Sequence, residues 1–189
     1  MVLYSMLQLL HQLVHGHTTL LDANTYYFMP TVNVDGVKAI EEQYLKDGTY
    51  LMKRKNGQKV NGTNCDSGTD LNRNWPYNFG KGRTNKKDVC SQDYPGPEPF
   101  SAPETRNMRD FLTSKKDELK FIYNFHTTGN MFFIPFAGKY PSNLMNSHPW
   151  MHKLFSEIVN EAQFPKGMKI GTAPEVLYEA GGDAADWAT

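Results

Sequence analysis

The middle of this 189-residue chain constrains its fold more than any other part. From residue 46 to residue 100 the sequence is dense in Gly, Asn, Asp, Pro and Lys, and it lacks the periodicity of a helix or a strand. A compact domain rarely contains so long an irregular stretch unless that stretch binds or catalyses something. We therefore expect a functional loop region that regular elements on both sides hold in place.

Helical patterns lie on both sides of this region. Leu3, Leu7, Leu10 and Val14 share one face of an amphipathic helix, which we expect to pack against the rest of the domain. A second helix is expected from about residue 101 to 114, with Ser101 as its N-cap and Glu104 completing a capping box. Residues 149–163 show a third helical pattern, and residues 37–45 are read as a short helix or an irregular segment.

Strand patterns alternate with these helices. Residues 25–34, 119–126 and 131–136 are rich in β-branched and aromatic side chains. The alternation predicts an α/β fold in which helices flank a mixed central sheet. The length suits one domain or most of one, and the sequence has no internal repeat or low-complexity segment.

Charge and hydropathy exclude two classes of partner. Lys plus Arg and Asp plus Glu each total 20, so the formal net charge is zero and no basic run favours nucleic acid or anionic lipid. The longest apolar stretch, residues 7–14, is short and interrupted by polar side chains, so it does not predict a membrane span. The first residues also lack the basic start and the cleavage site of a secretion signal.

The two cysteines, Cys65 and Cys90, both lie in the irregular region. A structural zinc site needs four ligands, and no histidine lies near them in sequence. A disulfide between them would contribute about 3 to 4 kcal/mol by restricting the unfolded chain. The glycosylation sequon Asn61-Gly62-Thr63 lies in the same region. Together these features favour an oxidising, secretory environment, and two free thiols with a chance sequon are the alternative.

Only one of the six histidines lies where a catalytic ligand is expected. His11/His15 and His148/His152 have helical i, i+4 spacing, but neither pair encloses the Glu of an H-E-x-x-H motif, so surface histidines are favoured. His126 ends an apolar predicted strand, and ligands gather at strand ends in α/β sheets. Position alone leaves a ligand and a structural role equally open.

Five segments, taken in order, resemble the zinc metallocarboxypeptidases of the carboxypeptidase A and B type. The departures from the family pattern are Val34 for a proline, Ala102 for a glutamate and Asp183 for a glycine. The resemblance covers nearly the whole chain and implies a partial carboxypeptidase catalytic domain over residues 1–189. The matching segments are residues 30–36 (PTVNVDG), 68–75 (GTDLNRNW), 94–104 (YPGPEPFSAPE), 124–126 (NFH) and 178–187 (YEAGGDAADW).

The resemblance implies how a substrate is gripped. A carboxypeptidase must recognise a free C-terminal carboxylate, and the planar fork of Arg73 suits a carboxylate. By resemblance Arg73 and Asn72 anchor that carboxylate and Tyr178 closes over the peptide. A structural ion pair is the alternative for Arg73. Peptide or protein C-termini are thus the expected substrates.

Catalytic residues are implied only in part. Arg54 resembles the arginine that stabilises the oxyanion, although Lys53 and Lys55 blur the register and a solvated basic turn is the alternative. His126 resembles one ligand of a single Zn²⁺, and catalytic zinc usually has three protein ligands. The family's H-x-x-E zinc motif and its catalytic glutamate do not occur in this sequence. We therefore expect a chain truncated at both ends that binds zinc poorly and hydrolyses nothing.

The resemblance also bears on the disulfide and on specificity. Cys65 and Cys90 flank the D-L-N-R-N-W segment as the family's loop disulfide does. Ala185 corresponds to the main specificity position, and alanine predicts a neutral pocket for apolar or aromatic C-terminal residues. Asp183 weakens that prediction, and Thr128 replaces an aromatic residue of the adjoining subsite. The leading hypothesis is a secreted zinc exopeptidase, and the runner-up is a non-catalytic module that binds peptide C-termini.

Overall fold

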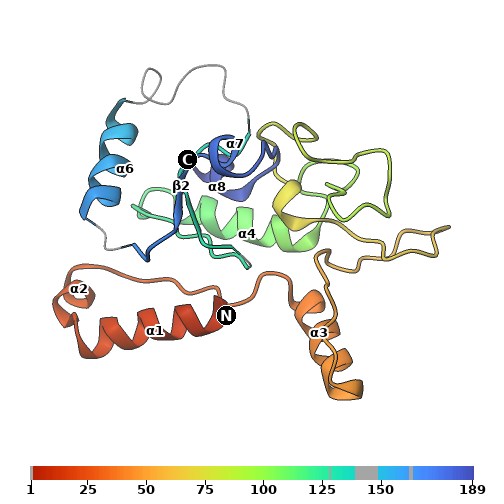
Figure 1. Ribbon diagram of the computed structural model, residues 1–189, viewed down its shortest axis with the longest axis horizontal. Coiled ribbons are helices and arrows are strands. Elements are labelled where there is room, and N and C mark those ends of the chain that lie inside the picture. The colour runs from red at the N-terminus through yellow and green to blue at the C-terminus, as the bar shows by residue number, and fades with distance from the viewer. Residues whose placement is uncertain (1, 128, 139–148, 162–163) are drawn as a thin grey trace.

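The computed structural model describes residues 2–127, 129–138, 149–161 and 164–189. Helices occupy both terminal parts of the chain, and a long irregular region separates them (Figure 1). The elements are, in order, α1 (Val2–His15), α2 (Thr18–Ala23), α3 (Val34–Asp47), η1 (Leu71–Arg73), α4 (Pro103–Ser114), β1 (Met131–Phe133), α6 (Pro149–Glu161), β2 (Lys169–Gly171), α7 (Ala173–Val176) and α8 (Ala184–Ala188).

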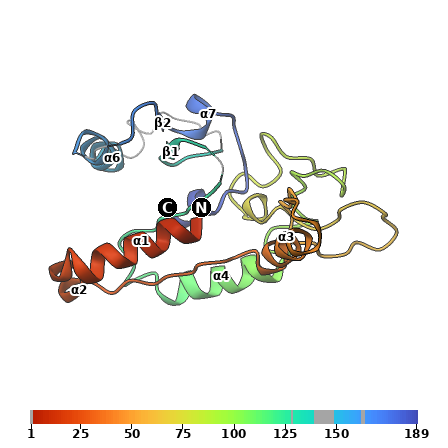
Figure 2. The same cartoon turned by 60° about the horizontal axis from the view of Figure 1, so that its bottom comes forward.

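Helix α1 forms where the apolar spacing predicts a helix, but the predicted packing face is wrong. Leu3, Leu7 and Leu10 are exposed, and the buried residue of this helix is Leu13. After α2 the chain continues as an extended segment that runs beside α4 (Figure 2). Tyr27 of this segment meets the ring of Phe111 edge-on, with 5.5 Å between the ring centroids. The segment therefore joins the N-terminal part to the centre of the molecule.

A side-chain cap explains where α3 begins, but not where α4 begins. The side chain of Asn33 accepts a hydrogen bond from the backbone N–H of Gly36, which places the start of α3 at Val34. Helix α4 covers the predicted range, but the expected capping role of Ser101 is wrong. The N-cap is Ala102 and makes no side-chain cap, while the Ser101 hydroxyl accepts a hydrogen bond from Asn74 instead.

The sheet in the described part of the chain is a parallel pair. Met131, Phe132 and Phe133 of β1 lie opposite Lys169, Ile170 and Gly171 of β2. Within the described ranges, residues 25–33 and 119–126 join no strand ladder, and residue 34 already belongs to α3. The strands predicted at residues 25–34 and 119–126 are therefore absent as hydrogen-bonded strands. No helix among the described residues is long and apolar enough to cross a membrane.

The predicted loop region is irregular and is tied together covalently. Between α3 and α4 the only helical turn in the described chain is the three-residue η1. Cys65 and Cys90 form a disulfide with 5.6 Å between their Cα atoms, which confirms the predicted pairing. The disulfide closes the loop that contains the D-L-N-R-N-W segment, so the chain on either side of that segment is fixed.

The best-packed part of the core lies under this loop. Trp75 is 1% exposed and its ring centroid lies 5.3 Å from that of Phe100 and 5.0 Å from that of Trp187. Asn74 beside it donates to the carbonyl oxygens of Pro95 and Glu98 and accepts from the backbone N–H of Ala102. Since an unpaired buried amide is costly, these bonds fix the loop against the start of α4.

Candidate peptide-carboxylate site

The D-L-N-R-N-W segment is a tight turn that divides its side chains between the interior and the site. Asp70 accepts a hydrogen bond from the backbone N–H of Asn72 at 3.1 Å and so caps η1. The indole N–H of Trp75 donates to the carbonyl oxygen of Leu71. The buried Asp70, Arg73 and Trp75 hold the turn, while Asn72 remains half-buried at its edge.

The 178–187 segment lies against this turn because a glycine permits a close backbone approach. Gly182 has φ +72°, and a Cβ built there would lie 2.1 Å from the carbonyl oxygen of Arg73. Its carbonyl oxygen accepts from the N–H of Trp75, and its own N–H donates to the carbonyl of Tyr77. A residue with a side chain would push the segments apart.

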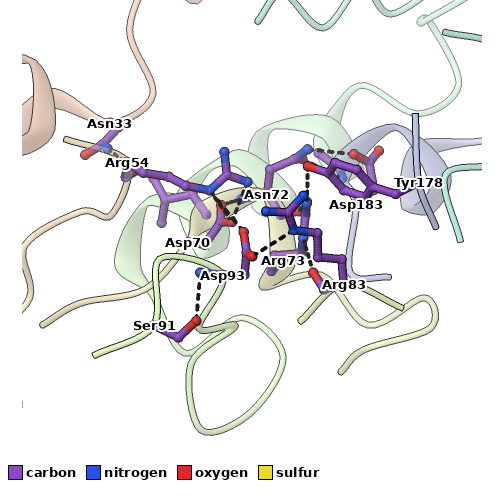
Figure 3. Close-up of polar contacts among 12 residues, drawn as sticks. Asn33, Arg54, Asp70, Asn72, Arg73, Arg83, Ser91, Asp93, Tyr178 and Asp183 are labelled. Atoms are coloured by element: carbon purple, nitrogen blue, oxygen red, sulfur yellow. Dashed lines mark hydrogen bonds and ion pairs between the residues drawn. The ribbon is translucent and has the colours of Figure 1, made fainter. Parts of the chain in front are cut away.

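Both the nitrogen and the oxygen of the Asn72 side-chain amide are hydrogen-bonded to the 178–187 segment. Its Nδ2 donates to the Asp183 carboxylate at 2.6 Å, and its Oδ1 accepts from the backbone N–H of Ala184 at 3.1 Å (Figure 3). The other oxygen of Asp183 accepts from the N–H groups of Ala185 and Asp186 and so caps α8. One carboxylate therefore joins the two segments and starts a helix.

Arg73 lies beside Asn72 and its guanidinium reaches Tyr178. The side chain donates to the carbonyl oxygens of Arg83 and Asn72 and, at 3.4 Å, to the Tyr178 hydroxyl. These bonds use three of the five N–H donors of a guanidinium. Arg83 lies over the Tyr178 ring with 4.7 Å from its guanidinium carbon to the ring centroid. Residues 105 positions apart in sequence thus form one cationic and aromatic cluster.

Arg54 reaches the same cluster from the other side. Its guanidinium pairs with the buried carboxylate of Asp70 at 2.6 Å and approaches Asp93 at 3.6 Å (Figure 3). Burial works to lower the pKa of Arg54, but the charges of Asp70 and Asp93 and the hydrogen bond to Asp70 outweigh it and raise that pKa. Burial raises the pKa of Asp70, against the opposing effect of the charges on Arg54 and Arg73.

The two lysines that flank Arg54 have other partners. Lys53 pairs with Asp66. Lys55 is fully buried and donates to the carbonyl oxygen of Val89 at 2.9 Å, and burial lowers its pKa. Among these three cations, Arg54 alone pairs with Asp70 in the described structure.

His126 lies in the same neighbourhood. Its side chain is exposed to solvent, yet the protein around it desolvates the imidazolium and lowers its pKa, and the charges of Asp183, Arg54, Asp70 and Arg73 act on it as well. Within the described residues, however, no three His, Cys, Asp or Glu side chains are grouped as a metal site. One imidazole does not fit the three-ligand set of a catalytic zinc.

Ala185 lines a small, mostly apolar cavity together with Met108, Leu112 and Ile122, among others. Of the other residues considered above, Thr128 and His148 lie outside the described residues.

Sequence reasoning missed several polar residues of the site. It did not assign Asp70 as the partner of Arg54, Asp93 as the carboxylate between Arg54 and Arg83, or Asp183 as the acceptor of the Asn72 amide. Only Asp183 carried a signal, because it replaces a glycine of the resembled pattern. It also missed Asp186, which accepts three hydrogen bonds from the N–H groups of Ala137 and Gly138.

A sequence profile of the zinc carboxypeptidases matches residues 1–189, the whole chain. The chain belongs to the zinc carboxypeptidase family. Its curated relatives in this family include the human carboxypeptidase O, 30% identical over 165 residues, and the carboxypeptidase B of Astacus astacus, 28% identical over 165 residues. A metallocarboxypeptidase A-like protein of Trichophyton verrucosum is 31% identical over 172 residues.

Solved structures of zinc carboxypeptidases confirm the fold class. Bovine thrombin-activatable fibrinolysis inhibitor, in complex with a tick carboxypeptidase inhibitor, matches 85% of the chain with a TM-score of 0.68 and 28% identity. The carboxypeptidase A of Helicoverpa armigera matches 85% of it with a TM-score of 0.61 and 27% identity. The three curated matches include 86–89% of this chain. The chain spans only 38–52% of the length of those relatives.

Proposed function

We propose that this chain is the substrate-recognising part of a zinc carboxypeptidase that releases single C-terminal residues from peptides. One observation carries the proposal: Asn72, Arg73 and Tyr178 lie together in one polar cluster, although 105 residues separate Arg73 from Tyr178. The three offer an amide, a guanidinium fork and a phenol, which are the donors that a peptide carboxylate needs. Residues 1–189 are proposed to be part of one catalytic domain.

Arg54 is proposed to stabilise negative charge on the carbonyl oxygen of the scissile bond. Its charge is held in place by Asp70 at 2.6 Å, and a fixed cation needs little reorganisation as that charge develops. Its side chain keeps 41% of its surface exposed, so it remains accessible to a substrate. Tyr178, held between Arg73 and Arg83, is proposed to cover the bound peptide.

His126 is proposed as one ligand of a zinc ion, which would activate the water for hydrolysis. The proposal is supported by the resemblance of residues 124–126 (NFH) to the segment that carries a zinc histidine in this family. Because the described residues group no three metal ligands, we propose that this chain alone binds zinc weakly and does not hydrolyse peptides. Zinc-dependent cleavage by the 189-residue chain would contradict this part of the proposal.

A neutral C-terminal residue is proposed as the preferred substrate. Ala185 brings no charge to the specificity position, and the nearby Asp183 carboxylate is already engaged by Asn72 and the start of α8. We also propose a secretory location, supported by the Cys65–Cys90 disulfide, since such bonds persist in oxidising compartments.

Digestion of matched peptides tests the proposal. A peptide ending in phenylalanine and its C-terminal amide are incubated with a protein that contains this chain, with zinc or with a chelator, and the products are read by mass spectrometry. A ladder of single-residue losses from the free acid, abolished by chelator and by amidation, is expected. Internal cleavage, or equal cleavage of acid and amide, would contradict a carboxypeptidase.

The same experiment addresses the second candidate, a module that binds peptide C-termini without cutting them. The specific observation in its favour is that the carboxylate-binding cluster is assembled in this chain whereas three metal ligands are not grouped among its described residues. Binding of the free acid that persists in chelator, with no ladder under any condition, favours the module.

A further inference from the structure

Asp183 is hydrogen-bonded to the side-chain amide of Asn72, which in the proposed function binds the substrate carboxylate. Its Oδ2 accepts from Asn72 Nδ2 at 2.6 Å, which is a short, charge-assisted hydrogen bond. A peptide C-terminus would offer the same chemical group, a carboxylate, to the same donor. The chain thus already holds one carboxylate at its proposed carboxylate anchor.

The geometry points to Asp183 as an internal competitor of the substrate carboxylate. This inference rests on the proposed role of Asn72. Asp183 is half-buried and stands at the N-cap of α8, where the N–H groups of Ala185 and Asp186 bind its other oxygen. Those bonds keep the carboxylate beside Asn72 when no peptide is present.

Arg73, the second proposed carboxylate-binding residue, is also hydrogen-bonded within the chain. Its guanidinium donates to Tyr178 at 3.4 Å and to the carbonyl oxygen of Asn72 at 2.6 Å, so the phenol competes with a peptide carboxylate for one of the Nη2 donors. Two groups of the chain thus compete with the peptide: Asp183 at the Asn72 amide and Tyr178 at Arg73. Asp183 therefore acts as a positioning residue that sets how tightly C-terminal carboxylates bind.

A second reading of Asp183, as an acid that selects Lys or Arg at the substrate end, predicts a different pattern. In that case its removal weakens binding of basic-ended peptides and leaves other peptides unchanged. Competition for Asn72 instead predicts that removal strengthens binding of every free-acid peptide, whatever its last side chain. The two readings differ in sign for a peptide ending in lysine.

Equilibrium binding in chelator separates these outcomes without any need for turnover. The variant is Asp183→Ser. The serine hydroxyl can still cap the N-terminus of α8, but serine has no carboxylate to accept a hydrogen bond from Asn72. Calorimetry compares N-acetylated tripeptides ending in phenylalanine or lysine, each as acid and amide. Asp183→Asn, which retains shape and removes the charge, is the second variant, and thermal unfolding confirms that both fold.

Competition predicts that Asp183→Ser binds both acids about tenfold more tightly than the wild type, since charge-assisted hydrogen bonds are stronger than neutral ones. Asp183→Asn should gain less, and the amides should be unchanged. Unchanged or weaker acid binding in Asp183→Ser, or a loss confined to the lysine peptide, would overturn the inference. If neither wild type nor variants distinguish acid from amide, the proposed carboxylate site itself fails, which is a separate result.

A second observation, in the irregular region just before Cys65, carries an independent inference. Asn61 is exposed and belongs to the only Asn-x-Ser/Thr sequence in the chain. It stands in a turn in which the N–H and hydroxyl of Thr63 both donate to the carbonyl oxygen of Val60. Gly62, at φ +80°, has nothing within 4 Å of a Cβ built there, so the turn projects into open space. We propose that Asn61 carries an N-linked glycan.

Expression behind a secretion leader in a eukaryotic host tests this site. Treatment with an amide-cleaving glycosidase should increase gel mobility and leave the Asn-to-Asp mass signature at residue 61. Asn61→Gln and Thr63→Ala should each abolish the mobility change, whereas Asn64→Gln, outside the sequon, should keep it. An unmodified residue 61 in protein recovered from the secretory pathway would overturn the proposal.

Discussion

Two regions of this molecule differ in which side chains they bury and which they expose to water. In the loop region with the 178–187 segment, buried polar groups such as Asn74, Lys55 and Asp70 all have protein partners. In the N-terminal helices and the 119–126 segment, large apolar side chains are exposed, among them Tyr4 at 65% and Tyr123 at 62%.

The geometry of the site is specified by the loop region. The loop region is fixed by hydrogen bonds, a disulfide and one aromatic cluster, all between residues of this chain. Exposed apolar side chains contribute little, because the hydrophobic effect acts only on surface removed from water. Substitutions of buried side chains in the first region should therefore be costly, and substitutions of exposed side chains in the second should be nearly neutral.

The largest effect is expected at the aromatic cluster. Trp75→Ala should lower the free energy of unfolding by about 4 kcal/mol, since it empties a buried site between Phe100 and Trp187. Trp150→Ala, at a side chain 63% exposed on α6, should cost about 0.5 kcal/mol or less. Urea unfolding followed by circular dichroism measures both, and equal losses would erase the proposed contrast.

The next effect separates two glycines with the same backbone conformation. Gly182→Ala should cost about 3 kcal/mol, because its Cβ meets the Arg73 carbonyl and the left-handed conformation is strained as well. Gly62→Ala shares the positive φ but meets no atom within 4 Å, so it should cost about 1 kcal/mol. Similar values for the pair would show that the 178–187 segment can move away from Arg73 at little cost.

A smaller effect depends on pH. Burial raises the pKa of Asp186 from 3.8 to about 6, although backbone N–H groups of Gly138 and Ala137 oppose the rise. The folded state then binds this proton more tightly than the unfolded state, so the group stabilises the fold below pH 4 and loses that contribution as pH rises to about 6. The wild type should lose about 2 kcal/mol relative to Asp186→Asn over that interval. Parallel pH profiles of the two proteins would refute this assignment.

The smallest effect is expected on α1. Leu7→Ser removes a side chain that is 55% exposed, so the change in unfolding free energy should stay within about 0.5 kcal/mol. Leu13→Ser, at the buried position of the same helix, should cost about 2 kcal/mol. A larger loss for Leu7 than for Leu13 would restore the face that the sequence pattern indicates.

These regions also differ in how far the sequence predicts them. Helical periodicity locates α1 and α6, because i, i+3 and i+4 spacing is a local property of the chain, and the start signal at residues 101–104 locates α4. It does not reveal which face is covered, so the choice of Leu13 over Leu10 is missed. Strands depend on a partner elsewhere in the chain, and residues 119–126 have the composition of a strand without a ladder in the described ranges.

Within the site, predictability falls with sequence separation. Asn72 and Arg73 are identifiable because their neighbours form a specific motif. The bond from Asn72 to Asp183 spans 111 residues and depends on the backbone approach at Gly182, which no local pattern encodes. Ser101 is a second example of a contact that the local sequence does not predict. Its neighbours indicate a helix cap, but its hydroxyl accepts a hydrogen bond from Asn74, 27 residues away.

The most direct test of the account is the affinity of this chain for a peptide acid against its amide, measured by calorimetry in chelator. We expect an N-acetylated tripeptide ending in phenylalanine to bind about 10- to 100-fold more tightly as the acid than as the amide. Arg73→Gln should abolish that ratio, and Arg109→Gln, on α4 beside Asp110, should leave it unchanged. Equal affinity of acid and amide for the folded wild type would contradict a carboxylate site at Asn72 and Arg73.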